Sequence, residues 1–106
     1  MKLPKKLKIG GHTWAVLYPY TFIDADNLEA QCEPNKLELR IRNNGQAESC
    51  VWVSLFHEVL HAIDKWAGYK ILERLEQDER TDGYVDALAE GLYQVLNDNN
   101  LLKKPK

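Results

Sequence analysis

The sequence has little cysteine and no long apolar run, and both absences narrow what the protein can be. Its 106 residues include two cysteines, Cys32 and Cys50, which are too few and too far apart for a disulfide framework or for paired CxxC metal ligands. In a reducing compartment they are most simply two small buried thiols. No window approaches the roughly 18 apolar residues of a membrane span, and the N-terminus lacks the apolar core of a signal peptide. We therefore expect a cytoplasmic protein without membrane contact.

A surplus of charge of one sign is also missing. The 14 basic and 16 acidic side chains give a formal net charge of −2, so the protein has no general attraction to polyanions and nucleic acid is not an expected partner. The lysines in "MKLPKKLKIG" fit a loose, solvated terminus. The length and the 44% of apolar residues predict one globular domain spanning residues 1–106, with frayed ends at 1–5 and 99–106.

Strand patterns occupy the first half of the chain. The segment "LKIGGHTWAVLY" places a short strand on each side of Gly10-Gly11, a pair typical of two-residue hairpin turns. The segment "KLELRIR" alternates, which predicts a half-buried strand with its leucines and isoleucine directed inward. Residues 21–31 are mixed, and "DADNLEAQ" fits either a loop or one short helical turn.

Helical patterns follow. The first runs from about 47 to 67, and Gly68 stands where a helix end favours a residue that can adopt positive φ. After the charged stretch "ERLEQDERTDG", a second helix is predicted from about 81 to 97. The residues expected on the buried sides are Val51, Leu55, Val59, Ala62 and Trp66 in the first helix and Val85, Leu88, Leu92, Val95 and Leu96 in the second. Strands followed by helices predict an α+β fold, a small antiparallel sheet with an N-terminal hairpin packed on two main helices.

The central stretch "SLFHEVLHAIDKW" carries the chemistry. His57 and His61 are four residues apart, so on a helix their rings lie on one face, one turn apart. Both can then bind one ion, and Zn²⁺ is expected because it favours nitrogen and carboxylate donors. Glu58 lies about 100° round the helix, where it can accept a proton from a metal-activated water. HExxH on a helix is the signature of the zinc metallopeptidases.

A zinc site of this kind needs a third protein ligand. The HExxHxxGxxH extension is absent, because positions 64 and 67 are Asp64 and Ala67, and the only other histidine lies far upstream in the hairpin. The remaining route is a carboxylate from the second helix. Glu79, Asp82 and Asp86 share one face there, at spacings of three and four.

With these residues identified, the sequence resembles a known family. "SLFHEVLHAID", followed after the charged stretch by "DGYVDALAEGLYQVL", looks like the small gluzincin-type metallopeptidases of phages and mobile elements, which are related to the ImmA/IrrE group of metallo-endopeptidases. That group adds a second helix opening Glu-x-x-Ala-Asn-x-Phe-Ala, whose glutamate is the third ligand. When residues 85–89 are aligned with the Ala-Asn-x-Phe-Ala part of this pattern, Asp82 falls at the ligand position. Aspartate is one methylene shorter than glutamate, so Glu79 stays an alternative.

The resemblance, which covers about residues 31–98, implies both a fold and an activity. The fold would be a minimal zincin-like domain in which the strand "LELRIR" is the edge that binds peptide backbone. His57, His61 and Asp82 would hold Zn²⁺, and Glu58 would activate the water that hydrolyses a peptide bond in a protein or peptide substrate. The alternative is a catalytically inactive zincin-like binding module with a structural metal, in phage or host regulation. Asp64, one turn beyond His61, either orients that imidazole or is an exposed acid.

Overall fold

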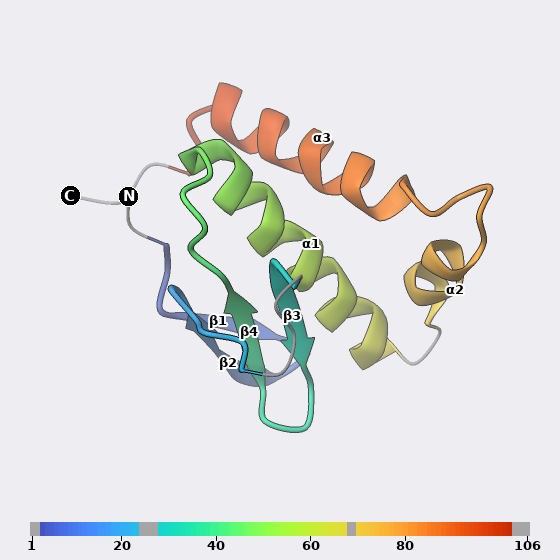
Figure 1. The fold of residues 1–106 in the computed structure, drawn as a ribbon, viewed down its shortest axis with the longest axis horizontal. Coiled ribbons are helices and arrows are strands. Elements are labelled where there is room, and N and C mark those ends of the chain that lie inside the picture. Colours follow the sequence, from blue (N-terminus) through green and yellow to red (C-terminus); the bar gives the residue numbers. More distant parts are fainter. Residues whose placement is uncertain (1–2, 24–27, 68–69, 103–106) are drawn as a thin grey trace.

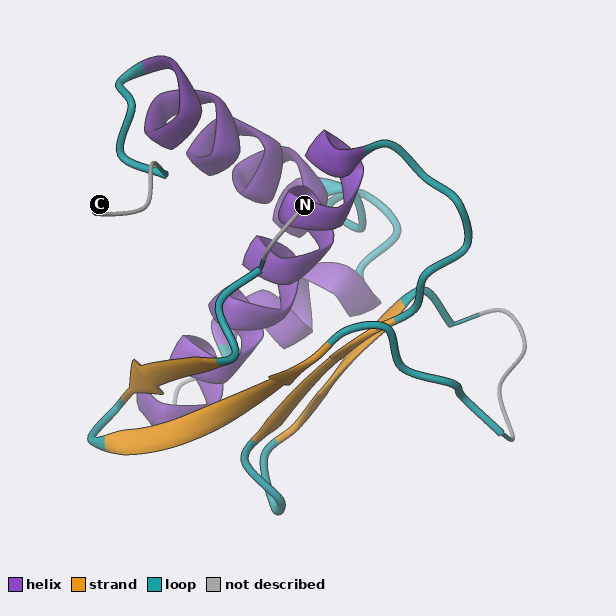
Figure 2. Cartoon of the chain, turned by 90° about the vertical axis from the view of Figure 1, so that its left-hand side faces the viewer, coloured by secondary structure: helices purple, strands orange, loops and turns teal. Residues whose placement is uncertain are grey.

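A four-stranded sheet and three helices form two layers, with the helices on one face of the sheet (Figures 1 and 2). The computed structural model describes residues 3–23, 28–67 and 70–102. The strands are β1 (Lys6–Ile9), β2 (His12–Leu17), β3 (Ala30–Glu33) and β4 (Glu38–Ile41), and the helices are α1 (Glu48–Ala67), α2 (Ile71–Gln77) and α3 (Tyr84–Asp98). The predicted α+β class is confirmed.

The sheet is mixed, whereas the sequence patterns predicted a wholly antiparallel one. Its strand order is β1-β2-β4-β3, with antiparallel pairs at β1–β2 and β3–β4 and a parallel pair at β2–β4. The parallel pair arises because the chain leaves β2, crosses to the far edge, and returns through β4 after β3. The segment "LELRIR" therefore lies inside the sheet, paired on both sides, and β3 is the free edge on that side.

The main core lies between the sheet and α1. Leu39 and Ile41 of β4 are completely buried, as are Val51 and Ala62 of α1, and Trp14 of β2 packs with them. These are the inward faces that the alternation in "KLELRIR" and the helical spacing of α1 predict. Because they do not involve α2, the core is complete without the charged stretch that follows α1.

The third helix returns antiparallel along α1, on the side away from the sheet (Figure 1). Val85 and Ala89 are the residues of α3 that are fully buried. Leu88 and Val95, which were predicted on the buried side, are exposed. The surface of α3 that contacts α1 is thus centred on Val85 and Ala89.

Two elements were not predicted from the sequence. β3 falls partly in the mixed segment, and all four of its residues are only half-buried. α2 overlaps the start of the charged stretch and has no fully buried residue, and its three apolar residues are too few to reveal a helical period. The proposed helix end at Gly68 and the outermost parts of the expected frayed ends, 1–2 and 103–106, lie outside the described residues.

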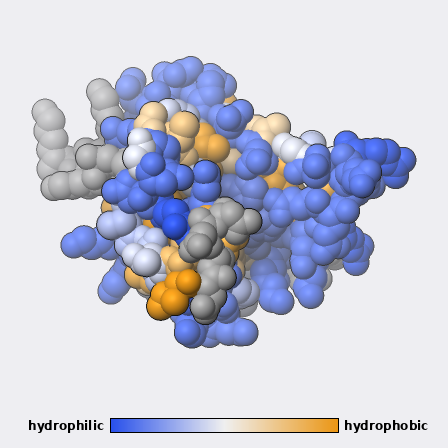
Figure 3. Space-filling view, in the orientation of Figure 1, coloured by the Kyte–Doolittle hydropathy of each residue, from blue (hydrophilic) through white to orange (hydrophobic). Residues whose placement is uncertain are grey.

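No helix in the described ranges has the length and apolarity needed to cross a bilayer. The face of the molecule drawn in Figure 3 is mostly hydrophilic, with apolar residues in small separate areas. Trp66, predicted in the core, is one of the exposed apolar residues, with 59% of its surface accessible.

Trp66 instead covers the hairpin turn between β1 and β2. Gly10 and Gly11 have φ values of +61° and +82°, which L side chains rarely adopt and which suit the two-residue turn. A Cβ added at Gly10 would lie 2.3 Å from Cγ of Trp66, whereas one at Gly11 would meet nothing within 4 Å. The indole also packs edge-on against His12, with ring centroids 5.2 Å apart.

We expect Gly10→Ala to destabilise the protein more than Gly11→Ala. Both substitutions force alanine into the left-handed region, at about 1–2 kcal/mol, but only the first also displaces Trp66. Thermal unfolding should show a melting temperature roughly 4–8 °C lower for each kcal/mol lost. In a Trp66→Ala background the difference between the two glycine variants should disappear; if it persists, contact with Trp66 is not its cause.

Candidate metal centre

Two histidines of α1 face the same hollow near the middle of the molecule. His57 and His61 have ring centroids 4.9 Å apart and side chains that are 19% exposed. Val51 and Leu55 pack α1 on the sheet, whereas the two histidine rings lie further round the helix and line a hollow together with Cys32 of β3 and residues of α2. The four-residue spacing and the phase of the helix together place both imidazoles at one point.

The third side chain at this point is Glu76, from α2. Its Oε1 lies 2.8 Å from Nε2 of His57, and its Oε2 lies 3.0 Å from Nε2 of His61. One ligand atom from each of these residues falls within 4.8 Å of the other two, and this is the only such group of three or more His, Cys, Asp or Glu among the residues that the structure describes. Two imidazole nitrogens and a carboxylate oxygen form a donor set that could hold a divalent cation.

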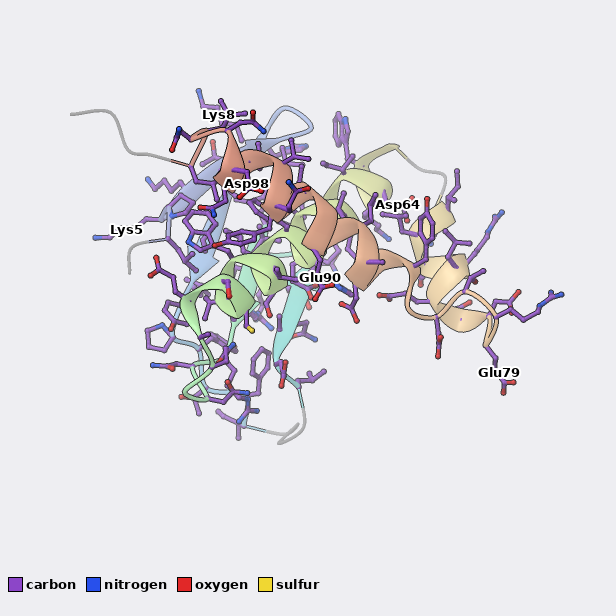
Figure 4. All side chains as sticks on the ribbon, turned by 90° about the horizontal axis from the view of Figure 1, so that it is seen from above. Lys5, Lys8, Asp64, Glu79, Glu90 and Asp98 are labelled. Atoms are coloured by element: carbon purple, nitrogen blue, oxygen red, sulfur yellow. The ribbon has the colours of Figure 1, made fainter. Side chains whose placement is uncertain are left out.

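The structure does not bring Asp82 or Glu79 to the histidines. Asp82 lies exposed in the turn before α3. Glu79 lies at the outer end of the connection between α2 and α3 and points away from the molecule, far from Asp64 on α1 (Figure 4). Glu76 therefore replaces Asp82 as the candidate third ligand. Glu76 was not predicted because the third ligand was expected near a single helix after the charged stretch, and the sequence did not reveal the separate helix α2.

Asp86, a third acid considered for the ligand position, contacts the other nitrogen of His57. Its Oδ1 lies 2.7 Å from Nδ1 of that ring. A neutral imidazole has one N–H and one lone pair. When Nδ1–H donates to Asp86, the lone pair on Nε2 points toward Glu76 and His61. A carboxylate that fixes the tautomer in this way is typical of metal-binding histidines.

Glu58 is buried beside this group. It is 7% exposed, and the backbone N–H of Cys32 in β3 donates a hydrogen bond to its carboxylate. Burial, and after it the negative charges of Glu76 and Asp86, together raise the pKa of Glu58 to about 8. A carboxyl group with a pKa near neutrality can both accept and release a proton.

Hollows reach this site from two sides. One of about 410 Å³ is lined by His57, Glu58 and His61 together with Cys32, Pro34 and residues of α2. A second, of about 200 Å³, shares His57 and Glu58 and extends toward Asp86. Ala30 of the edge strand β3 lines both. The site is therefore accessible along the free edge of the sheet.

Two further residues considered from the sequence lie elsewhere. His12 is in the hairpin against Trp66 and is not part of the group. The carboxylate of Asp64 accepts hydrogen bonds from backbone N–H groups at the start of α2, so the structure gives it a different role from orienting His61.

No family model matches the chain, and comparisons with curated proteins and with solved structures find no significant match. The resemblance to the gluzincin-type peptidases therefore depends on the sequence around His57 and His61.

We expect Glu76→Gln to abolish or strongly weaken zinc binding, because it removes a charged oxygen donor between the two imidazoles. Glu79→Gln and Asp82→Asn are matched controls that should retain about one zinc per chain. The measurement is the metal content of the purified variants after loading and dialysis. Zinc retained by Glu76→Gln and lost from Asp82→Asn would contradict the ligand set seen in the structure.

The two cysteines should differ in reactivity. Burial, and after it the charges of Glu58 and Glu33, together raise the pKa of Cys32 to about 12, whereas Cys50, which was expected to be buried, is exposed. At pH 8 the thiolate fraction of Cys32 is then roughly 10⁻⁴, since thiolate is the reactive form. Iodoacetamide should modify Cys50 first, as measured by mass spectrometry on Cys32→Ser and Cys50→Ser variants. Equal rates in the two variants would contradict this assignment.

Proposed function

We propose that this protein is a zinc-dependent peptidase that acts in the cytoplasm on a protein or peptide substrate. The observation that carries the proposal is the Glu76 carboxylate meeting Nε2 of both His57 and His61 beside the buried carboxyl of Glu58. HExxH supplies three of these four side chains from one helix, and α2 supplies the fourth. The two free cysteines are compatible with a reducing compartment.

The residues present fit zinc. Two imidazoles and one carboxylate are a common protein ligand set in catalytic zinc sites, which keep a further position open. Donors on one tetrahedral zinc lie about 3.3 Å apart, given bonds of about 2.0–2.2 Å. The distances of 2.8 and 3.0 Å from Glu76 to the two histidines are a few tenths of an ångström shorter. A small outward movement of these side chains would admit the ion.

In this proposal the side chains of the protein bind the metal, orient its ligands and transfer protons. Zinc held by His57, His61 and Glu76 would supply Lewis-acid activation of water and of the carbonyl group, and its charge would favour the ionised form of Glu58. Glu58 takes one proton from the water whose oxygen bonds to the carbonyl carbon. It then delivers that proton to the nitrogen of the scissile bond, so the C–N bond breaks and an amine leaves beside a carboxylic acid. Asp86 holds the ring of His57 in the orientation this requires.

The edge strand offers a place for the substrate. β3 has one side paired to β4 and the other free, and Ala30 and Cys32 line the hollow that contains Glu58. An extended peptide can hydrogen-bond to such an edge as an added strand. The resemblance suggested "LELRIR" as the edge that binds peptide, but this segment lies inside the sheet. We therefore place the peptide-binding edge at β3.

A binding module with a structural metal is the second candidate, and one observation favours it. No residue of α2 is buried, so a cation shared by Glu76 and the two histidines would itself fasten α2 to α1. Such a protein could serve in phage or host regulation without hydrolysing anything. The two candidates differ in whether Glu58 has a chemical role.

We expect Glu58→Gln to reduce hydrolysis by at least about 10²-fold, the typical contribution of a positioned acid–base group, while its zinc content stays at the parental level. Cleavage of a mixed peptide library, followed by mass spectrometry, measures the activity without knowledge of the natural substrate. Glu48→Gln, an exposed glutamate at the start of the same helix, is the control and should cleave like the parent. If the zinc-loaded parent cleaves no more than Glu58→Gln, the binding module is favoured.

A further inference from the structure

The helix that carries Glu76 has little to hold it in place. α2 is seven residues long and none of its side chains is fully buried; Leu72, Leu75 and Glu76 are half-buried. Its N-cap residue, Lys70, makes no side-chain capping bond. An isolated helix of this length is unstable in water, because too few hydrogen bonds offset the cost of nucleation. The position of Glu76 must therefore be fixed by contacts that α2 makes with other elements.

Asp64 of α1 provides the contact at the start of α2. Its Oδ1 accepts a hydrogen bond from the backbone N–H of Ile71 at 2.8 Å, and its Oδ2 accepts from Leu72 and Glu73 at 3.2 and 3.4 Å. These N–H groups have no acceptor within their own helix. A carboxylate at this end also interacts favourably with the helix dipole. One side chain of α1 thus caps a different helix.

The cap acts close to the candidate ligand. Glu76 lies one turn after Leu72, so fixing the first turn of α2 fixes the direction of the Glu76 side chain. At the other end, the hydroxyl of Thr81 donates to the carbonyl of Leu75 at 2.7 Å. His57, His61 and Asp64 follow one another on the same helix at spacings of four and three. The two histidines and the cap that positions their partner therefore share one rigid element.

We propose that Asp64 is a positioning residue for Glu76: by capping α2 it holds the third donor against the two histidines, and so sets the affinity of the site for its metal. This inference rests on the proposed zinc site for its effect on affinity, and on the structure alone for its effect on α2. The core around Leu39 and Val51 does not include α2, so losing the cap should leave the rest of the fold intact.

The main test compares zinc affinities of Asp64 variants with a matched control, by competition with a chromophoric chelator. Asp64→Ala should bind zinc about 10- to 100-fold more weakly than the parent, the usual effect of removing a residue that orients a ligand. Asp64→Asn keeps one acceptor oxygen and should lie between the two. Asp78→Ala is the control, because Asp78 also accepts three hydrogen bonds, all from Arg80, and none from the start of α2. It should bind like the parent.

A second readout needs no metal. In chelator-treated protein, Asp64→Ala should speed amide exchange at Ile71, Leu72 and Glu73 and shift the ring signals of His57 and His61, because Glu76 is no longer held between them. Asp78→Ala should change neither. The melting temperature of Asp64→Ala should stay close to that of Asp78→Ala, which separates loss of positioning from loss of fold.

The outcomes are distinct. Zinc affinity of Asp64→Ala within about twofold of the parent, while Glu76→Gln loses zinc, would overturn the role of Asp64 and leave the proposed site standing. A parent that binds no zinc would overturn the proposed function, and the amide and histidine signals would then decide whether Asp64 positions Glu76. If Asp64→Ala fails to fold, the isosteric Asp64→Asn decides: parental affinity and parental histidine signals would overturn the proposal.

Discussion

The contact between the Glu76 carboxylate and the two Nε2 atoms of His57 and His61 is the interaction on which the rest of the site depends. It joins α2 to α1, and it brings the negative charge of Glu76 close to the carboxyl groups of Glu58 and Asp86. That charge is one of the reasons why the pKa of Glu58 rises, after burial itself. A divalent cation at the three donors would offset the repulsion among these carboxylates. Since the core lies between α1 and the sheet, its packing does not depend on the charged cluster.

How much the sequence predicts depends on whether an element buries a regular apolar face. β4 and α1 do so, and their completely buried Leu39, Ile41 and Val51 are the residues that alternation and helical spacing indicate. The hairpin was recognisable because both of its turn glycines need positive φ. Trp66 fits the helical spacing equally well, yet it covers Gly10 at the surface. Periodicity identifies the face of a helix but not how far along the helix the partner layer extends.

The third donor escaped prediction for the same physical reason. α2 has no fully buried residue, and its three apolar residues, Ile71, Leu72 and Leu75, are too few to reveal a helical period beside the charges that follow them. A resemblance to a two-helix pattern then placed the ligand at Asp82, in the turn before α3. The face of α3 nearest the histidines does contribute an acid, Asp86, but it reaches Nδ1 of His57 and leaves Nε2 for another donor. A short helix that is held through its backbone N–H groups cannot be predicted from apolar periodicity, because that periodicity reflects buried side chains.

The site thus combines one rigid helix with two elements held mainly through backbone hydrogen bonds. α1 contributes both histidines, the candidate base Glu58 and the cap Asp64. β3 contributes a backbone N–H to Glu58, and the backbone of α2 donates to Asp64. Backbone groups are present whatever the side chain, so these bonds place few demands on the sequence of α2, whereas Ala30 and Cys32 of β3 also pack against the core. The constraint falls on the few side chains that receive those bonds, which explains how so small a helix can place a carboxylate against two imidazoles without a core of its own.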